Sequence, residues 1–216
     1  MTTATLLIPE QRTVLNQVSW QTFINLLNDL GNNRVIRLYY DQGVLEIMTP
    51  LGEHENNNRF IDDLVRAIAD ELNLNLKKMG SLTLKREELL KGAEPDSCYY
   101  LNNEPLVRHQ QNINLESDPP PDLVLEIDIT SSSLDKQTIY AAFEIPELWR
   151  YNGQKLEVFI LDKTTQSYQK STQSLYFPWL PLEIIPQYIR QSLRDGETAT
   201  LKTFRHWVRE QHHSQE

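Results

Sequence analysis

Two carboxylates stand at alternate positions of one strand-like segment, residues 122–129. Side chains of a strand point alternately to its two faces, so Glu126 and Asp128 share a face. A rise of about 3.3 Å per residue places their Cβ atoms roughly 6.5 to 7 Å apart, close enough to bracket a divalent cation. The alternative is a strand whose second face is simply hydrated. The apolar run 123–125 indicates a mostly buried strand, and buried like charges need a partner.

A second acidic position follows a proline in the run Glu94-Pro95-Asp96. The proline biases Glu94 toward an extended backbone, and Asp96 begins a strand that continues through Cys98 and Tyr100. An aspartate at a strand entrance is also a common turn or capping residue. The motif therefore suggests a ligand only in combination with other acids.

A third acid, Glu53, lies in the first turn of a long helix expected over residues 51–73. It precedes Phe60 by seven positions, which is about two turns, so we expect it to point toward the core. The alternative is a favourable interaction of an acid with the helix N-terminus. We expect its neighbour His54 to be a polar surface residue.

Lys136 precedes Tyr140 and Phe143 by four and seven positions, and so lies on their face of a helix expected over residues 134–144. A cation in the first turn of a helix opposes the helix dipole. We therefore expect an anionic partner or a functional role for Lys136. The alternative is that the stem is buried while the ammonium reaches water.

The elements that must position these residues follow from apolar periodicity, turn residues and helix stop signals. The pattern predicts a mixed α/β fold with a central sheet formed mostly by the middle of the chain. Helices are expected over 19–30, 51–73, 134–144, 182–193 and 199–210, a hairpin over 34–48, and strands near 74–84, 96–101, 122–129, 148–151, 156–161 and 167–171.

In this combination of a helix acid, an aspartate after proline, a strand glutamate and a helix lysine, the chain resembles a known family. It is similar to the PD-(D/E)XK nuclease superfamily, and within it to a bacterial group of restriction-endonuclease-like proteins of unknown function. The resemblance covers about residues 19–180. It is carried by Gly52-Glu53-His54, Glu94-Pro95-Asp96, the run from Pro121 to Ile127 with serines after it, and Lys136 four positions before Tyr140, ahead of Glu147-Leu148-Trp149.

The resemblance implies a restriction-endonuclease-like core, a central mixed sheet flanked by helices, and a role for each acid. Asp96 and Glu126 would hold a divalent ion, Mg²⁺ or Mn²⁺, while Glu53 assists and Lys136 positions or activates water. Asp128 stands where the superfamily has a lysine, and Lys136 is its substitute on the helix. We include Asp128 among the expected metal ligands, because the three acids would crowd one pocket.

Asp122, in the second proline-aspartate pair, shares the face of Glu126 but lies four residues away. That spacing corresponds to about 13 Å along an extended strand.

Composition limits the partners. The 216 residues carry 21 basic and 30 acidic side chains, a net charge of −9, which excludes a strongly basic nucleic-acid coat. A bound polyanion must meet a local patch, for which the candidates are Lys77, Lys78, Lys85, Arg86, Arg59 and Arg66.

Cys98 is the only cysteine, so the chain can form no internal disulfide, and we expect this residue to be a small buried hydrophobe. The start of the chain has no signal-like pattern, and no apolar run approaches the length of a membrane span. We expect a cytoplasmic protein. Residues 1–216 should form a single domain, with a core over about 19–180 and a helical extension over about 181–213.

The leading hypothesis is a metal-dependent endonuclease that acts on nucleic acid, with DNA as the expected substrate and a homodimer as the expected assembly. A second hypothesis is a catalytically inactive nuclease fold that serves as a binding or regulatory module, which the net charge of −9 favours somewhat. A third is a serine hydrolase using one of Ser131 to Ser133 with His54 and an acid. The glycines of a nucleophile elbow do not surround those serines, which weighs against it.

Overall fold

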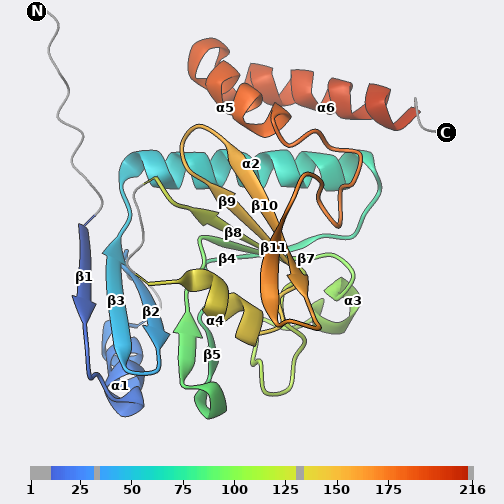
Figure 1. Ribbon diagram of the computed structural model, residues 1–216. Helices are drawn as coiled ribbons and strands as arrows, with labels where there is room; N and C mark the ends of the chain where they lie inside the picture. Colours follow the sequence, from blue (N-terminus) through green and yellow to red (C-terminus); the bar gives the residue numbers. More distant parts are fainter. Residues whose placement is uncertain (1–10, 32–34, 130–133, 214–216) are drawn as a thin grey trace, which may run out of the picture.

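The computed structural model describes residues 11–31, 35–129 and 134–213, with side chains described up to residue 211. It confirms a mixed α/β fold, with two sheets and six α-helices in the described residues. Figure 1 shows the larger sheet at the centre of the molecule, between the long helix α2 and the short helix α4.

The larger sheet has six strands in the order β11-β10-β9-β8-β7-β4. Strands β8 and β9 are parallel and the other neighbours are antiparallel, so the sheet is mixed, as expected. The strands are β4 (Lys77–Gly80), β7 (Ser97–Tyr100), β8 (Leu123–Ile127), β9 (Glu147–Tyr151), β10 (Leu156–Asp162) and β11 (Ser167–Ser171).

The two faces of β8 separate as alternation predicts. Leu123, Leu125 and Ile127 pack in the core that contains the apolar residues of α2 (Gly52–Glu71). Val124 faces the other way, into the core that contains Tyr140 of α4 (Lys136–Ala142). Glu126, two residues on, therefore points toward α4.

Two further helices cover the outer side of α2, namely α5 (Ile184–Asp195) and α6 (Glu197–His213) (Figure 1). Cys98 is fully buried, as expected. Among the described residues, no helix has both the length and the hydrophobicity that a membrane crossing requires.

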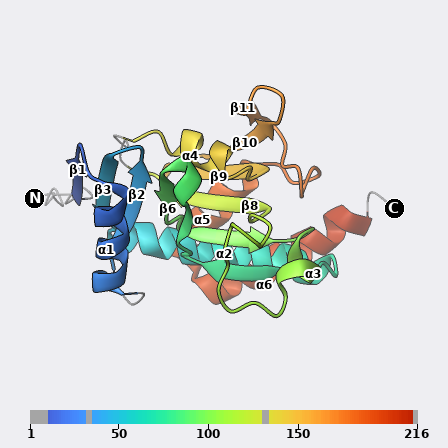
Figure 2. The same cartoon turned by 90° about the horizontal axis from the view of Figure 1, so that it is seen from below.

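A second, five-stranded sheet has the order β1-β3-β2-β6-β5 and carries the expected hairpin of β2 (Arg37–Asp41) and β3 (Val44–Thr49). The hairpin turn uses positive φ at Gln42 and Gly43, as tight hairpins require. Figure 2 shows this smaller sheet, with helix α1, beside one end of the larger one. The remaining elements of this part are β1 (Gln11–Leu15), α1 (Trp20–Leu30), β5 (Leu84–Arg86), the 3-10 turn η1 (Glu87–Leu89) and β6 (Lys91–Ala93).

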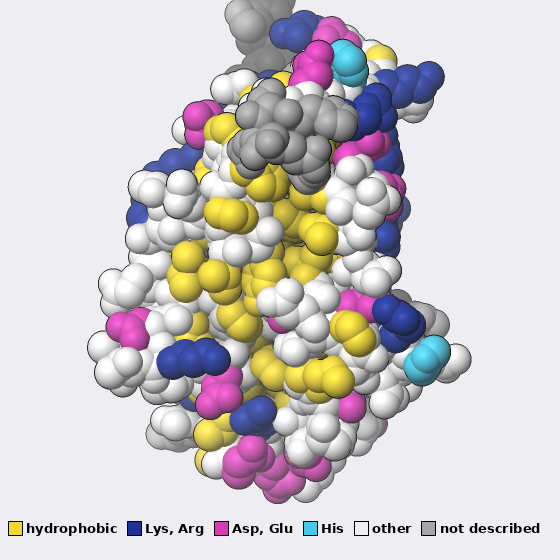
Figure 3. Space-filling view, turned by 90° about the vertical axis from the view of Figure 1, so that its right-hand side faces the viewer, with side chains coloured by type: hydrophobic (Ala, Val, Ile, Leu, Met, Phe, Trp, Pro, Cys, Tyr) yellow, Lys and Arg dark blue, Asp and Glu magenta, His cyan; other side chains and the backbone are white. Residues whose placement is uncertain are grey.

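The opposite end of the molecule carries exposed apolar side chains among polar ones (Figure 3). Figure 3 shows a band of hydrophobic side chains on the right-hand side of Figure 1, where α3 (Glu104–Val107) lies. Leu106 of α3 is 68% exposed. The carboxylates of Asp96 and Glu126 lie instead at the junction of the two sheets.

Residues 94–96 connect the two sheets, because β6 ends at Ala93 and β7 begins at Ser97. The buried Glu94 carboxylate accepts hydrogen bonds from the Leu38 backbone N–H at 2.8 Å and from the Thr83 hydroxyl at 2.6 Å. Glu94 is therefore a structural residue that ties this connection to β2.

The smaller sheet approaches α1 closely at Gly92, where an added Cβ would overlap the Phe23 ring. We expect Gly92→Ala to lower the free energy of unfolding by about 1–3 kcal/mol, because the ring must leave its packed position. Urea denaturation measures this effect. Gly52→Ala is the control, since its Cβ would meet no atom within 4 Å. Equal stabilities of the two variants would contradict the close packing.

Candidate active site

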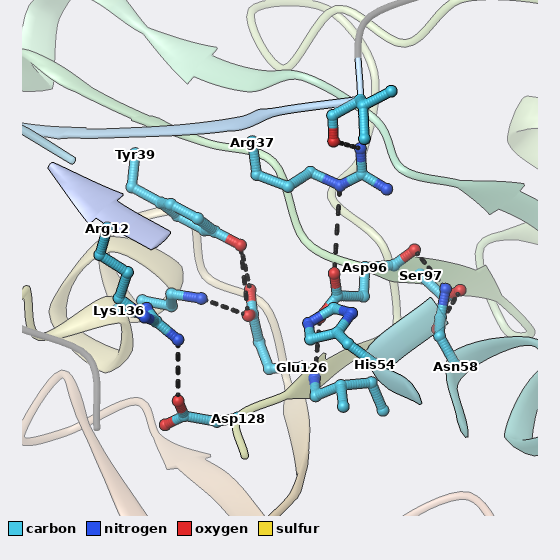
Figure 4. Close-up of polar contacts among 12 residues, drawn as sticks. Arg12, Arg37, Tyr39, His54, Asn58, Asp96, Ser97, Glu126, Asp128 and Lys136 are labelled. Carbon is cyan, nitrogen blue, oxygen red and sulfur yellow. Dashed lines mark hydrogen bonds and ion pairs between the residues drawn. The ribbon is translucent and has the colours of Figure 1, made fainter. Parts of the chain in front are cut away.

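Asp96 and Glu126 come together on adjacent strands. In the β7–β8 register Ser97 lies opposite Leu125, so the next pair outward is Asp96 and Glu126. The Ile127 backbone N–H donates a hydrogen bond to Asp96 Oδ2 at 2.8 Å. Figure 4 shows the two carboxylates side by side, between groups from the smaller sheet and the N-terminal ends of α2 and α4.

The Glu126 carboxylate is only 2% exposed and is surrounded by donors. Lys136 Nζ lies 2.6 Å from Oε2, the Tyr140 hydroxyl donates to Oε1, and the Tyr39 hydroxyl lies 3.3 and 3.4 Å from the two oxygens. Burial raises the pKa of Glu126; Lys136 opposes this shift and the nearby Asp96 charge adds to it. Glu126 is thus a buried carboxylate held mainly by one cation.

Lys136 has the anionic partner that its position predicts. It is 8% exposed, in the first turn of α4, and its ammonium also lies 3.8 Å from the centre of the Tyr39 ring. Tyr140, four residues later on the same helical face, reaches the same carboxylate. Burial, reinforced by the Glu126 charge, raises the pKa values of Tyr39 and Tyr140 well above the ordinary value, so both hydroxyls remain donors.

Asp96 has one oxygen engaged and one oriented into the site. Oδ2 accepts from Ile127 and lies 3.2 Å from His54 Nε2. Oδ1 is buried without a hydrogen-bond partner in the described part of the chain, and its nearest cation is Arg37, with Nε at 4.0 Å. A buried carboxylate oxygen without a hydrogen-bond donor is a suitable ligand for a cation.

The expected orientation of the helix acid is wrong. Glu53 is exposed, whereas His54, expected at the surface, is 1% exposed and faces Asp96. The buried stripe of α2 is centred on Ile61, seven residues after His54, while Phe60 lies at its edge. Counting from Phe60 therefore placed the wrong neighbour toward the sheet.

Asp128 is paired with a residue outside the expected set. Arg12 of β1 lies 3.1 Å from its carboxylate and 2.8 Å from that of Glu46, which is fully buried. Within the described ranges, no three His, Cys, Asp or Glu side chains are arranged to hold a metal ion. Metal ligation by Asp96, Glu126 and Asp128 stays a prediction.

The chain matches the model of a known protein family. A family model described as "Uma2: Putative restriction endonuclease" matches residues 20–192. The chain belongs to the Uma2 family. The match confirms the resemblance drawn from the sequence motifs. None of the curated proteins compared with the chain is a match.

In this Uma2 protein, Asp122 has a structural role. It is buried and accepts hydrogen bonds from the backbone N–H groups of Leu101 and Asn103 and from the Tyr176 hydroxyl. Asp122 therefore fixes the loop that follows β7. Ser131 to Ser133 lie outside the described residues.

Two of the six expected basic residues reach the site. Arg59 and Lys78 line a cavity of about 300 Å³ whose wall includes Asp96. Lys77 donates instead to backbone carbonyls, those of Val107 and Arg108 among them, and Arg66 to that of Leu76. Lys85 lines a different cavity, and the Arg86 Nε lies 4.0 Å from Glu88.

No motif in the sequence marks Arg12, Arg37 or Tyr39 as site residues. All three come from the smaller sheet, which the sequence pattern does not place against the larger one. The alternation of β2 is the one available signal, because Arg37 and Tyr39 share a face of that strand.

The Lys136–Glu126 pair can be tested by a double-mutant cycle. We expect Lys136→Met to lower the free energy of unfolding by about 3–5 kcal/mol, because it leaves a buried carboxylate without its cation. Adding Glu126→Gln should recover part of this loss, since no charge is then left unpaired. Denaturant unfolding of the parent, the two single variants and the double variant gives the coupling free energy of the pair. Arg59→Met is the control, because its pair with Glu55 is exposed and should be worth less than about 1 kcal/mol. Additive single effects would contradict the pairing.

Proposed function

We propose that this Uma2 protein is a divalent-metal-dependent endonuclease that hydrolyses phosphodiester bonds of DNA. The observation that carries the proposal is the pair of buried carboxylates, Asp96 and Glu126, beside the ammonium of Lys136. Membership of a family described as a putative restriction endonuclease supports it.

The donor set fits a hard cation. Asp96 Oδ1 is buried with no hydrogen bond from the described residues, and Glu126 lies opposite on the next strand. Carboxylate oxygens are the ligands that Mg²⁺ and Mn²⁺ prefer. Asp96 and Glu126 would hold the ion, and Asp128 is the weaker third candidate because Arg12 already binds its carboxylate.

When bound, the ion would polarise a phosphoryl oxygen and lower the pKa of a coordinated water. The protein residues supply the rest. Lys136 would bring a cation to the developing negative charge, and Tyr39 and Tyr140 hold the Glu126 carboxylate in one orientation. The Ile127 N–H and His54 do the same for Asp96.

The alternative, an inactive binding module, also has a specific observation in its favour. Lys136 occupies Glu126 directly at 2.6 Å, so the ion must displace this contact or share the carboxylate. The two functions make different predictions for cleavage and for metal binding.

The first test is cleavage. Supercoiled plasmid, single-stranded DNA and RNA are incubated with Mg²⁺, Mn²⁺ or chelator. We expect metal-dependent cleavage of DNA that falls at least about 100-fold in Asp96→Asn, Glu126→Gln and Lys136→Ala. Asp195→Asn, an exposed acid on α5, should cleave as the parent does. Undiminished cleavage by Asp96→Asn would refute the site, and the absence of both metal binding and cleavage would favour the binding module. Light scattering on the same sample tests the expected homodimer.

The second test is metal binding to the folded chain. Mn²⁺ at 100 times its dissociation constant should stabilise the protein by about 2.7 kcal/mol, since only the folded chain assembles the site. The melting temperature should be higher with Mn²⁺ than with chelator in the parent, in Lys136→Ala and in Asp195→Asn. Asp96→Asn should lose it. Asp128→Asn decides the third ligand, because an unchanged response excludes Asp128. A full response by Asp96→Asn would remove Asp96 from the metal site.

A further inference from the structure

Arg37 lies between two cavities. One, of about 300 Å³, has Asp96 in its wall, and the other, of about 330 Å³, has Glu94 in its wall. Arg37 and Ser81 line both. A ligand that occupied both cavities would therefore contact Arg37 and Ser81.

The Arg37 charge is less compensated than the other cations beside Asp96. Arg59 Nε lies 2.8 Å from Glu55, and Lys78 is bonded to Asp62. Arg37 Nε is buried without a hydrogen-bond acceptor among the described residues, 4.0 Å from Asp96 Oδ1, and Nη1 donates to a backbone carbonyl at 3.5 Å. Figure 4 shows the guanidinium directed at Asp96. A planar guanidinium with open donors suits a phosphate.

The cavity beyond Arg37 has a different chemistry. Its polar lining groups are the hydroxyls of Ser81 and Thr83, the amides of Gln111 and Asn112, which both donate and accept hydrogen bonds, and the Glu94 carboxylate; Ile36, Met79, Leu82 and Ile113 contribute apolar surface. Hydroxyls and amides suit the hydrogen-bonding edge of a nucleobase, and the apolar side chains suit its face. A volume of about 330 Å³ is at the small end of ligand pockets and admits one nucleotide rather than a double helix.

We infer that the substrate strand is unpaired at this site, with Arg37 binding a phosphate next to the scissile one and the 330 Å³ cavity receiving one base. A base inside a duplex cannot enter such a pocket unless it leaves the stack, which costs a few kcal/mol. The inference rests on the proposed nuclease function and adds its substrate class, a single-stranded or locally unpaired nucleic acid.

Binding in the presence of chelator tests the inference apart from catalysis. Fluorescence anisotropy compares a single-stranded oligothymidylate, a blunt duplex of equal length, and an all-abasic oligomer with the same number of phosphates. We expect the single strand to bind at least tenfold more tightly than either of the others. Equal binding of the duplex, or equal binding of the abasic oligomer, would overturn the inference. Cleavage with metal is scored separately, so loss of strand preference and absence of nuclease activity are distinguished.

Substitution of Arg37 tests the phosphate contact. Arg37→Gln should weaken single-strand binding at least tenfold and reduce the salt dependence of log Kd by about 0.7, as expected for one lost phosphate contact. Arg37→Lys should recover part of the affinity and of the salt slope. Arg194→Gln, an exposed arginine on α5, is the matched control and should bind as the parent does. Thermal unfolding verifies that each variant folds. A folded Arg37→Gln with parental affinity and salt slope would overturn the assignment.

Discussion

The buried carboxylate of Glu126 is the constraint on which the rest of the site depends. A charged group removed from water is stable only when it is paired and hydrogen-bonded. The compensating groups come from two other elements, Lys136 and Tyr140 on α4 and Tyr39 on β2. Movement of either element away from β8 would leave a charge or a hydroxyl without its partner. The polar contacts therefore hold the two sheets and α4 in one arrangement, in addition to the apolar packing between them.

The same constraint explains why Asp96 is fixed so firmly. The chain leaves the smaller sheet at Ala93 and enters the larger at Ser97, and Glu94 anchors this short passage through the Leu38 N–H and the Thr83 hydroxyl. The Ile127 N–H then binds Asp96 itself. Backbone donors and secondary-structure ends, rather than a flexible loop, set the position of this carboxylate. Such support preorganises a site for a ligand before the ligand arrives.

Local periodicity predicted the parts of the site that lie within one element. The alternation of 122–129 predicted that Glu126 lies on the other face of the strand from Leu125 and Ile127. Helical spacing predicted that Lys136 and Tyr140 share a face. In both elements the burial of one face decides the pattern. Contacts between elements could not be predicted this way. His54 and Glu53 differ by one residue, or about 100° around the helix, and only the packed sheet shows which one faces it. The short strands β1 and β6 pair with distant partners and have little pattern of their own.

The structure shows how the chain accommodates Asp128, which departs from the superfamily pattern. Where the superfamily pattern has a lysine after the strand glutamate, this chain has an acid, which adds a third carboxylate to the face of Glu126. Arg12 binds that acid and the buried Glu46 together, so a cation from β1 offsets the added negative charge. Arg12 lies before residues 20–192, the part that matches the Uma2 model. A cation from β1, the edge strand that pairs with β3, thus offsets negative charge that the acid at position 128 adds to the face of Glu126.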